Sequence, residues 1–229
     1  MFFWGDKNQN LITKALQMKP QGQLRNYLKT PLVDLKNPVQ KINYLVLDFE
    51  TTGLDHRQDH IISLGFTEIK HGRIQLKKSQ HHLVKTEKKL LSDNVSIHQI
   101  TDDQMATGIG IEAMMNLLLG QIAGKVLVAH YQSIEYNFIQ HLSQKLYGHT
   151  LPLQMVDTLI IEKRRLQKLL RPIGTNQLRL FNLRTQYNLP RYHAHNAMED
   201  AIATAELLLA QISHRQLAGY QLKLKDILS

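Results

Sequence analysis

The spacing of apolar residues divides the chain into a first half rich in strands and a second half in which strands and helices alternate. The run YLVLDF, at residues 44–49, is apolar except for its acid and ends at a Thr-Thr-Gly turn. Such a run is typical of a strand buried on both faces. HIISLGFTEI (60–69) and RIQLKKSQHHLV (73–84) follow, joined at a His-Gly break, and predict two further strands in an antiparallel meander.

In the second half, apolar runs predict strands at 125–130 and 153–156. Helical spacing of apolar residues predicts helices around these strands, at residues 111–122, 133–146, 159–170, 177–187 and 197–213. A meander followed by alternating helices and strands predicts an α/β fold, with a mixed five-stranded sheet flanked by helices on both faces.

The first 40 residues have the pattern of an N-terminal extension. Two short helical pieces, LITKALQMKP and QLRNYLKT, are broken at Pro20. We expect residues 1–40 to pack on a main domain at 41–214, which a C-terminal tail at 215–229 follows. The alternative is that the extension contacts another protein.

Composition narrows the class of protein. The chain has 229 residues, 43% of them apolar, and no cysteine, which excludes disulfides, zinc–thiolate sites and a cysteine nucleophile. Without a signal-peptide pattern or a membrane-length apolar run, we expect a cytoplasmic protein that does not enter a membrane. The net charge of +9 attracts phosphate backbones, but it is also compatible with a merely soluble basic surface.

Asp48 and Glu50 lie two residues apart at the end of the first predicted strand. Because strand side chains alternate, both carboxylates leave the sheet on the same face. Two buried like charges repel unless a cation neutralises them, and carboxylate oxygens are ligands that Mg²⁺ and Mn²⁺ prefer. A bare Asp-x-Glu pair is more often a solvated strand end, so the metal interpretation needs support from elsewhere in the chain.

Two later segments supply that support. VAHYQSIEYNFI (128–139) and HNAMED (195–200) follow LDFETTGLD (47–55) in the chain. In this order, the three motifs resemble those of the DnaQ-like 3′→5′ exonuclease superfamily, in its DEDDh branch, which includes exonucleases like the epsilon subunit of DNA polymerase III. The resemblance runs from about residue 43 to residue 213 and implies a ribonuclease H-like fold.

The resemblance also implies a catalytic site. Two divalent ions, Mg²⁺ or Mn²⁺, would be held by four carboxylates, those of Asp48, Glu50, Glu135 and Asp200. His195 would be the general base that takes a proton from water, since the ordinary pKa of histidine lies near neutrality. His193 is a rival for that role, and only the family spacing selects His195.

Two positions depart from the family pattern. Glu135 stands where the second motif usually has aspartate, and Tyr131 replaces the common asparagine. Glutamate keeps the charge and adds a methylene, so Glu135 could reach a metal directly or through water, or could weaken that metal. The alternative is that Glu135 is an ordinary acid on a helix surface.

The third motif makes physical sense by itself. Asn196 and Glu199 form a capping-box-like pair for the helix that follows. This cap places Asp200 in the first helical turn and His195 just before the helix, so that both side chains can converge on one site.

The resemblance further implies contacts with the 3′-terminal nucleotide. They would come from Thr51, Thr52, Leu54, which would wedge against a base, and His98. His130 is expected to be structural. The basic residues at 163–168 favour a solvated helix face over a track for phosphates.

We therefore expect a metal-dependent 3′→5′ exonuclease that releases nucleoside monophosphates from single-stranded DNA. The alternatives are an exoribonuclease acting on short RNA, and a nucleic-acid-binding module with an impaired metal site. A DNA polymerase, or another replication or repair protein, is an expected partner.

Overall fold

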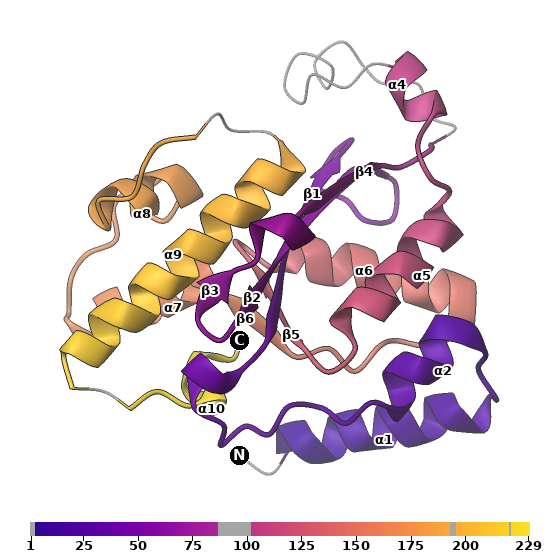
Figure 1. Cartoon of the computed structure of the whole chain (residues 1–229), viewed down its shortest axis with the longest axis horizontal. Helices are drawn as coiled ribbons and strands as arrows, with labels where there is room; N and C mark the ends of the chain where they lie inside the picture. Colours follow the sequence, from indigo (N-terminus) through magenta and orange to yellow (C-terminus); the bar gives the residue numbers. More distant parts are fainter. Residues whose placement is uncertain (1–2, 87–101, 193–195, 220) are drawn as a thin grey trace.

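A computed structural model describes residues 3–86, 102–192, 196–219 and 221–229. Its centre is a six-stranded sheet with β1 (Tyr44–Thr51) in the middle (Figure 1). On one side β1 pairs antiparallel with β2 (Ile61–Lys70), and on the other it pairs parallel with β5 (Val126–Ala129) and through it with β6 (Met155–Asp157). The structure confirms the mixed α/β sheet with helices on both faces.

The sheet has six strands rather than the five that were predicted, because the edge segment 73–84 is split. Its two parts, β3 (Arg73–Ile74) and β4 (Gln80–Leu83), both pair antiparallel with β2. Between them the chain leaves the sheet in the 3₁₀ turn η2 (Leu76–Lys78). An edge strand tolerates such an interruption, since it pairs on one side only.

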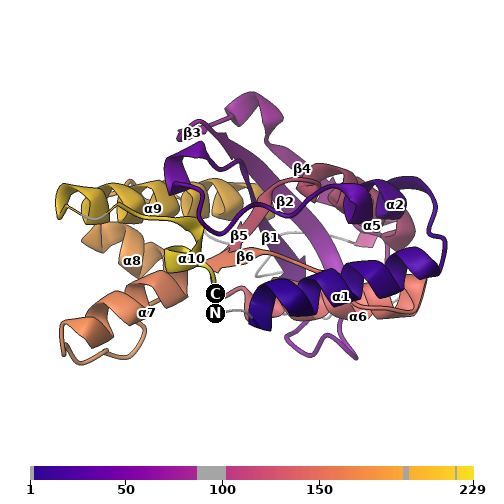
Figure 2. The ribbon, with the colours of Figure 1, turned by 90° about the horizontal axis from the view of Figure 1, so that it is seen from below.

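Helices cover the sheet in two groups, which lie on opposite sides of the strands (Figure 2). One group comprises α1 (Phe3–Gln17), α2 (Gly22–Lys29), α5 (Ile111–Ile122) and α6 (Ser133–Tyr147). The other comprises α7 (Thr158–Lys168), α8 (Leu180–Gln186), α9 (Ala197–Leu217) and α10 (Leu224–Ile227). Two short helices complete the described elements, η1 (Val39–Lys41) and α4 (Asp102–Ala106). No helix within the described ranges has the length and apolar character needed to cross a membrane.

The predicted helices are present, with ends that local contacts set. The helix predicted at 111–122 is confirmed as α5. The helix predicted at 177–187 is shorter, because the extended backbone of Arg179 makes it the N-cap and α8 begins only at Leu180. The last long helix continues beyond its predicted end at residue 213 to Leu217.

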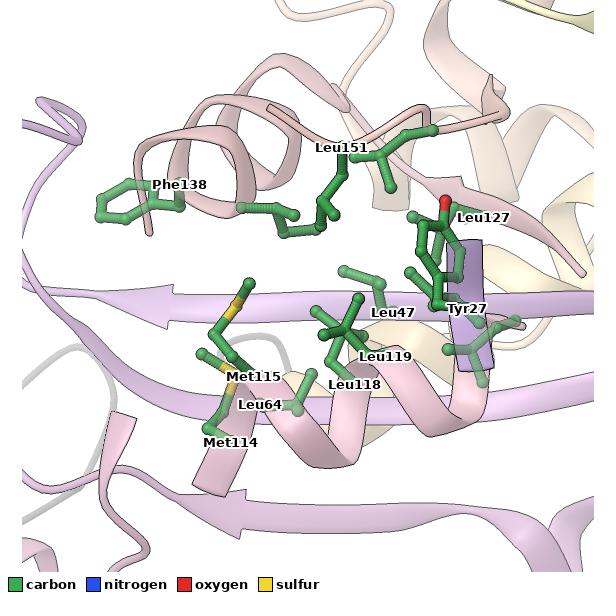
Figure 3. Packing of buried hydrophobic residues seen from close by; sticks show 14 of the residues in the cluster. Tyr27, Leu47, Leu64, Met114, Met115, Leu118, Leu119, Leu127, Phe138 and Leu151 are labelled. Atoms are coloured by element: carbon green, nitrogen blue, oxygen red, sulfur yellow. The ribbon is translucent and has the colours of Figure 1, made fainter. Parts of the chain in front are cut away.

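The main core lies between β1 and β2 and the helices α2, α5 and α6. Figure 3 shows Leu118 and Leu119 of α5 next to Leu47 of β1. Each fully buried side chain of this size contributes about 1.5–3 kcal/mol. Tyr27 of α2 is buried in the same cluster and donates a hydrogen bond to the Pro152 carbonyl at 2.8 Å. The N-terminal helices thus share the core of the sheet.

A second apolar cluster lies on the opposite face of β1, under α9. It contains Val46 of β1 and Leu208 of α9, and the C-terminal residues close it with Leu224 and Ile227. The last residue, Ser229, donates its backbone N–H to the Met155 carbonyl at 3.0 Å. Residues far apart in the sequence therefore meet beside β6.

Candidate active site

The carboxylates of Asp48 and Glu50 leave β1 on the face that α9 covers. Leu45 and Leu47 belong to the α5 cluster, whereas Val46 belongs to the α9 cluster. Alternation along the strand therefore directs Asp48 and Glu50 toward α9, as the spacing predicts. Glu50 is buried and Asp48 is partly buried, and the pairing with β2 shifts immediately after Glu50.

A glycine on β2 lets the start of α9 approach these acids. Gly65 lies opposite Asp48 in the sheet. A Cβ atom at this position would lie 2.1 Å from the Ala197 carbonyl carbon and 2.1 Å from the Met198 nitrogen. Every other residue is therefore excluded unless the helix moves, because the obstacle is backbone.

The start of α9 is fixed by its cap. The Asn196 side-chain oxygen accepts hydrogen bonds from the backbone N–H groups of Met198 at 3.1 Å and Glu199 at 3.2 Å. The Asp200 backbone N–H donates to the Asn196 carbonyl at 2.8 Å, which begins the helical ladder. The predicted Asn196 cap is confirmed, and Asp200 lies in the first turn of α9.

These elements bring three acids together. One side-chain oxygen each from Asp48, Glu50 and Asp200 lies within 4.8 Å of the other two. Burial raises the pKa of Asp48 well above its ordinary value, and the charges of Glu135, Glu50 and Asp200 raise it further. Burial and all three neighbouring charges therefore act against ionisation, which a bound cation would reverse.

Glu135 lies outside that group of three, but its charge acts on Asp48. It is buried in the first turn of α6, so it is not an ordinary surface acid. Burial raises its pKa to about 8, the charges of Asp157 and Glu50 also raise it, and a Phe49 backbone hydrogen bond opposes the shift. Among the residues that the structure describes, none gives its buried Oε2 atom a hydrogen-bond partner. A buried carboxylate oxygen of this kind suits a divalent cation.

Asp157 has a role in the site that none of the three motifs predicts. This buried acid at the end of β6 accepts the backbone N–H groups of Tyr131 at 3.0 Å and Gln132 at 3.1 Å, and of Leu159 at 2.8 Å. It caps α7 and fixes the turn that leads into Glu135. An acid between a predicted strand and a predicted helix has the pattern of an N-cap, which is the signal that could have identified it.

His130 is structural, as expected. Its Nε2–H donates to the Leu178 carbonyl at 2.9 Å, and its Nδ1 lies 2.8 Å from the Thr158 hydroxyl. Burial lowers its pKa to about 4, against the opposing effect of the Leu178 hydrogen bond. The ring is therefore neutral near pH 7 and both its nitrogens are occupied by the fold.

Of the predicted substrate-binding residues, two threonines shape the turn after β1. The Thr51 hydroxyl donates to the Gly53 carbonyl at 2.8 Å, and the Thr52 hydroxyl donates to Asp59 at 3.1 Å. Leu54 projects from this turn with 73% of its surface exposed. His98 and His195, together with the rival His193, lie outside the described residues.

Two of the basic residues of α7 contact other residues of the protein. Arg165 forms a 2.6 Å ion pair with the buried Glu162. Arg164 donates to the Leu228 carbonyl at 2.8 Å. These two cations therefore contact the fold, whereas Lys163 and Lys168 are exposed, as expected for a solvated helix face.

The fold is a mixed sheet with clustered acids at the end of its central strand, and comparison with known proteins assigns its family. An exonuclease family model, RNase T, matches residues 45–208. This match spans more than half of the chain, so the chain belongs to the RNase T family of exonucleases. The family recognised from the three motifs is thereby confirmed.

Among curated proteins, the chain is similar to a PolC-type DNA polymerase III of Thermotoga petrophila, with 28% identity over 188 residues. That match covers 82% of this chain but 13% of the polymerase. The DNA polymerase III subunit epsilon of Treponema pallidum is 28% identical over 175 residues, covering 76% of this chain and 79% of that subunit. Among solved structures, the nuclease domain of 3′hExo, a DEDDh family member bound to rAMP, has a TM-score of 0.65 at 11% identity, and the match covers 84% of this chain and 98% of that domain.

Proposed function

We propose that the chain is a metal-dependent 3′→5′ exonuclease that removes nucleoside monophosphates from single-stranded DNA. The observation that carries this proposal is the cluster of Asp48, Glu50 and Asp200 at the end of the central strand, with the unpartnered Oε2 of Glu135 beside it. Membership of an exonuclease family supports the reaction class, and the polymerase III relatives favour DNA over RNA.

The residues at the site fit a pair of divalent ions. The donor set consists of carboxylate oxygens alone, which suits Mg²⁺ or Mn²⁺ better than softer metals. Asp48, Glu50, Glu135 and Asp200 would hold the ions. When bound, the ions would supply positive charge that favours ionised water and offsets the charge of the reacting phosphate.

The protein's own groups would position the strand and move the proton. His195 precedes the Asn196 cap in the chain and would accept a proton from the attacking water. Thr51, Thr52 and His98 would contact the terminal nucleotide, with Leu54 wedged against its base.

In this reaction the water oxygen bonds to phosphorus and the bond from phosphorus to the 3′ oxygen of the preceding nucleotide breaks. That oxygen takes up a proton, so a nucleoside 5′-monophosphate leaves and the strand retains a new 3′ hydroxyl. A replication or repair protein, such as a DNA polymerase, is the partner that the polymerase III relatives suggest.

A gel assay with 5′-labelled oligonucleotides tests this function. We expect Mn²⁺ to produce a ladder of strands shortened from the 3′ end, with DNA shortened faster than RNA, and we expect chelator to abolish it. Circular single-stranded DNA, which has no end, is the control and should stay intact. Binding without shortening would favour the binding-module alternative, and faster shortening of RNA would favour the exoribonuclease.

A further inference from the structure

Tyr131 combines unusual exposure with a position close to the acids. It lies four residues before Glu135, at the position where the family motif usually has asparagine. The residue does not belong to the core, and 52% of its surface is exposed. An exposed aromatic ring just before the helix that carries a buried acid is available to a bound molecule.

An open cavity of about 450 Å³ lies against Tyr131. Most of its wall is apolar and comes from α7, α8 and the segment between them, with contributions from Leu159, Ile173, Leu178 and Leu180. Arg179 and Asn176 also line the cavity, but almost none of its wall is polar. An apolar wall beside an exposed aromatic ring suits the edge of a flat heterocycle.

The Tyr131 backbone is held firmly in an uncommon conformation. Its φ angle is 65°, a left-handed value that bulky residues rarely adopt. Asp157 maintains it by accepting the N–H groups of Tyr131 and Gln132, and the neighbouring His130 is bonded through both ring nitrogens. Residues kept in an uncommon backbone conformation by their surroundings are often functional. Here the hydrogen-bonded turn fixes the position of the Tyr131 Cα atom, from which the side chain extends.

We propose that Tyr131 is a stacking platform for a base of the substrate strand, with the adjoining cavity receiving the edge of that base. The inference rests on the proposed function, since the occupant is a strand whose 3′ end lies at the acids. Stacking on an aromatic ring tolerates any base, which suits an exonuclease that must release all four nucleotides. Arg179 is a cationic residue next to this cavity, and its charge would favour the approach of a phosphate backbone.

The structure offers a matched set of variants. Tyr131→Asn removes the ring and tolerates the left-handed backbone, so it should fold, whereas Tyr131→Phe keeps the ring. Tyr136→Ala is the control, because Tyr136 is also exposed on α6, at 43%, but lines a different cavity with Asn8 and Leu11. The probes are single-stranded DNA oligonucleotides with 2-aminopurine at the last, second-last or third-last position, mixed with protein in chelator to prevent cleavage.

In wild type, we expect the fluorescence of 2-aminopurine to be quenched by stacking at one of these positions. Tyr131→Asn should abolish that quenching and weaken binding about tenfold, in the range that loss of one base–aromatic contact produces. Tyr131→Phe and Tyr136→Ala should behave as wild type. Replacing the stacked base with an abasic residue should weaken binding to wild type but not to Tyr131→Asn.

Equal quenching and affinity in wild type and Tyr131→Asn would overturn the inference, whether or not the protein cleaves DNA. Quenching that wild type shows at all three probe positions and that Tyr131→Asn loses at all of them alike would also overturn it, since a local contact acts on one nucleotide. Shortening of 5′-labelled DNA, measured separately with Mn²⁺, reports on the proposed function. Quenching that depends on Tyr131 without any shortening would therefore leave the platform standing while the exonuclease proposal fell.

Discussion

Asp48, Glu135 and His130 all lie near the carboxyl ends of the parallel strands, and burial is the main cause of the pKa shift of each. Burial disfavours the charged form, so the carboxyl pKa values rise and the histidine pKa falls. The two cases differ because His130 has hydrogen-bond partners for both ring nitrogens, whereas one oxygen of Glu135 has none within the described part of the chain. The fold satisfies the neutral histidine, and a bound cation would stabilise the ionised acids.

The lowered pKa of His130 predicts a pH dependence of stability. As pH falls below 6.5, the ordinary pKa of histidine, His130 binds a proton in the unfolded chain. In the folded protein its pKa is about 4, so the ring stays neutral. The stabilising contribution is therefore complete above pH 6.5 and is lost as pH falls toward 4. By pH 5 the loss is up to about 2 kcal/mol, from roughly 1.4 kcal/mol per pKa unit.

Urea unfolding at pH 7.5 and pH 5.0 measures this loss. His130→Gln is the comparison, because glutamine does not titrate and its amide can still donate to the Leu178 carbonyl. The variant should be less stable at pH 7.5 but should lose about 2 kcal/mol less on acidification. An identical pH dependence in both proteins would show that His130 is not held neutral.

At the scale of elements, the close approach of β2 and α9 positions Asp200 beside Asp48. Gly65→Ala places a methyl group against the backbone of Ala197 and Met198, so the start of α9 must move. We expect a loss of about 1–3 kcal/mol of stability from overpacking. We also expect roughly a hundredfold loss of exonuclease rate, since a shift of about 1 Å can misplace a catalytic group to that extent.

Gly120→Ala is the matched control for that change. Gly120 lies within the helix α5, and a Cβ atom added to it would lie 3.4 Å from the flexible Gln23 side chain. Alanine should preserve activity and raise stability by up to about 1 kcal/mol through its helix propensity. Thermal melts and initial rates of both variants provide the test. Normal activity in Gly65→Ala would mean that the approach of α9 does not set the site.

Periodicity was sufficient to predict most elements and the face on which Asp48 and Glu50 lie, because both follow from local spacing. It did not predict the interruption of the edge segment at Leu76, since pairing along β2 decides whether that segment stays in the sheet. The motifs also located Glu135 and Asp200. They did not identify Asp157, whose role depends on a turn 25 residues earlier in the chain that only the fold brings near.

At the scale of the whole molecule, both ends of the chain pack on the exonuclease fold. The α2 residues Leu24, Tyr27 and Leu28 are buried in the main core, and Ser229 is hydrogen-bonded at β6. We propose that the N-terminal extension, residues 1–40, is a clasp on its own domain. The alternative is that residues 1–40 bind a partner protein. The apolar side chains of this extension would then have to leave the core.

Deleting residues 1–38 should therefore lower the melting temperature. The three buried α2 side chains together contribute about 4.5 kcal/mol or more. That loss corresponds to roughly 10 °C or more in a domain of this size. Tyr27→Phe, which removes only the hydrogen bond to Pro152, should cost about 1 kcal/mol and is the milder comparison. An unchanged melt after the deletion would contradict the clasp.

Cleavage is proposed to depend on the clustered carboxylates, which would hold the divalent ions. The most direct test is the rate at which nucleoside monophosphate is released from single-stranded DNA with Mn²⁺, compared between wild type, Asp48→Asn and Glu135→Gln. These substitutions remove charge and keep shape, so the two variants should fold yet lose most of the activity, at least about a hundredfold for Asp48→Asn. Release of nucleoside monophosphate by Asp48→Asn at the wild-type rate would contradict a role of Asp48 in cleavage. A near-normal rate for Glu135→Gln would remove Glu135 from the metal site.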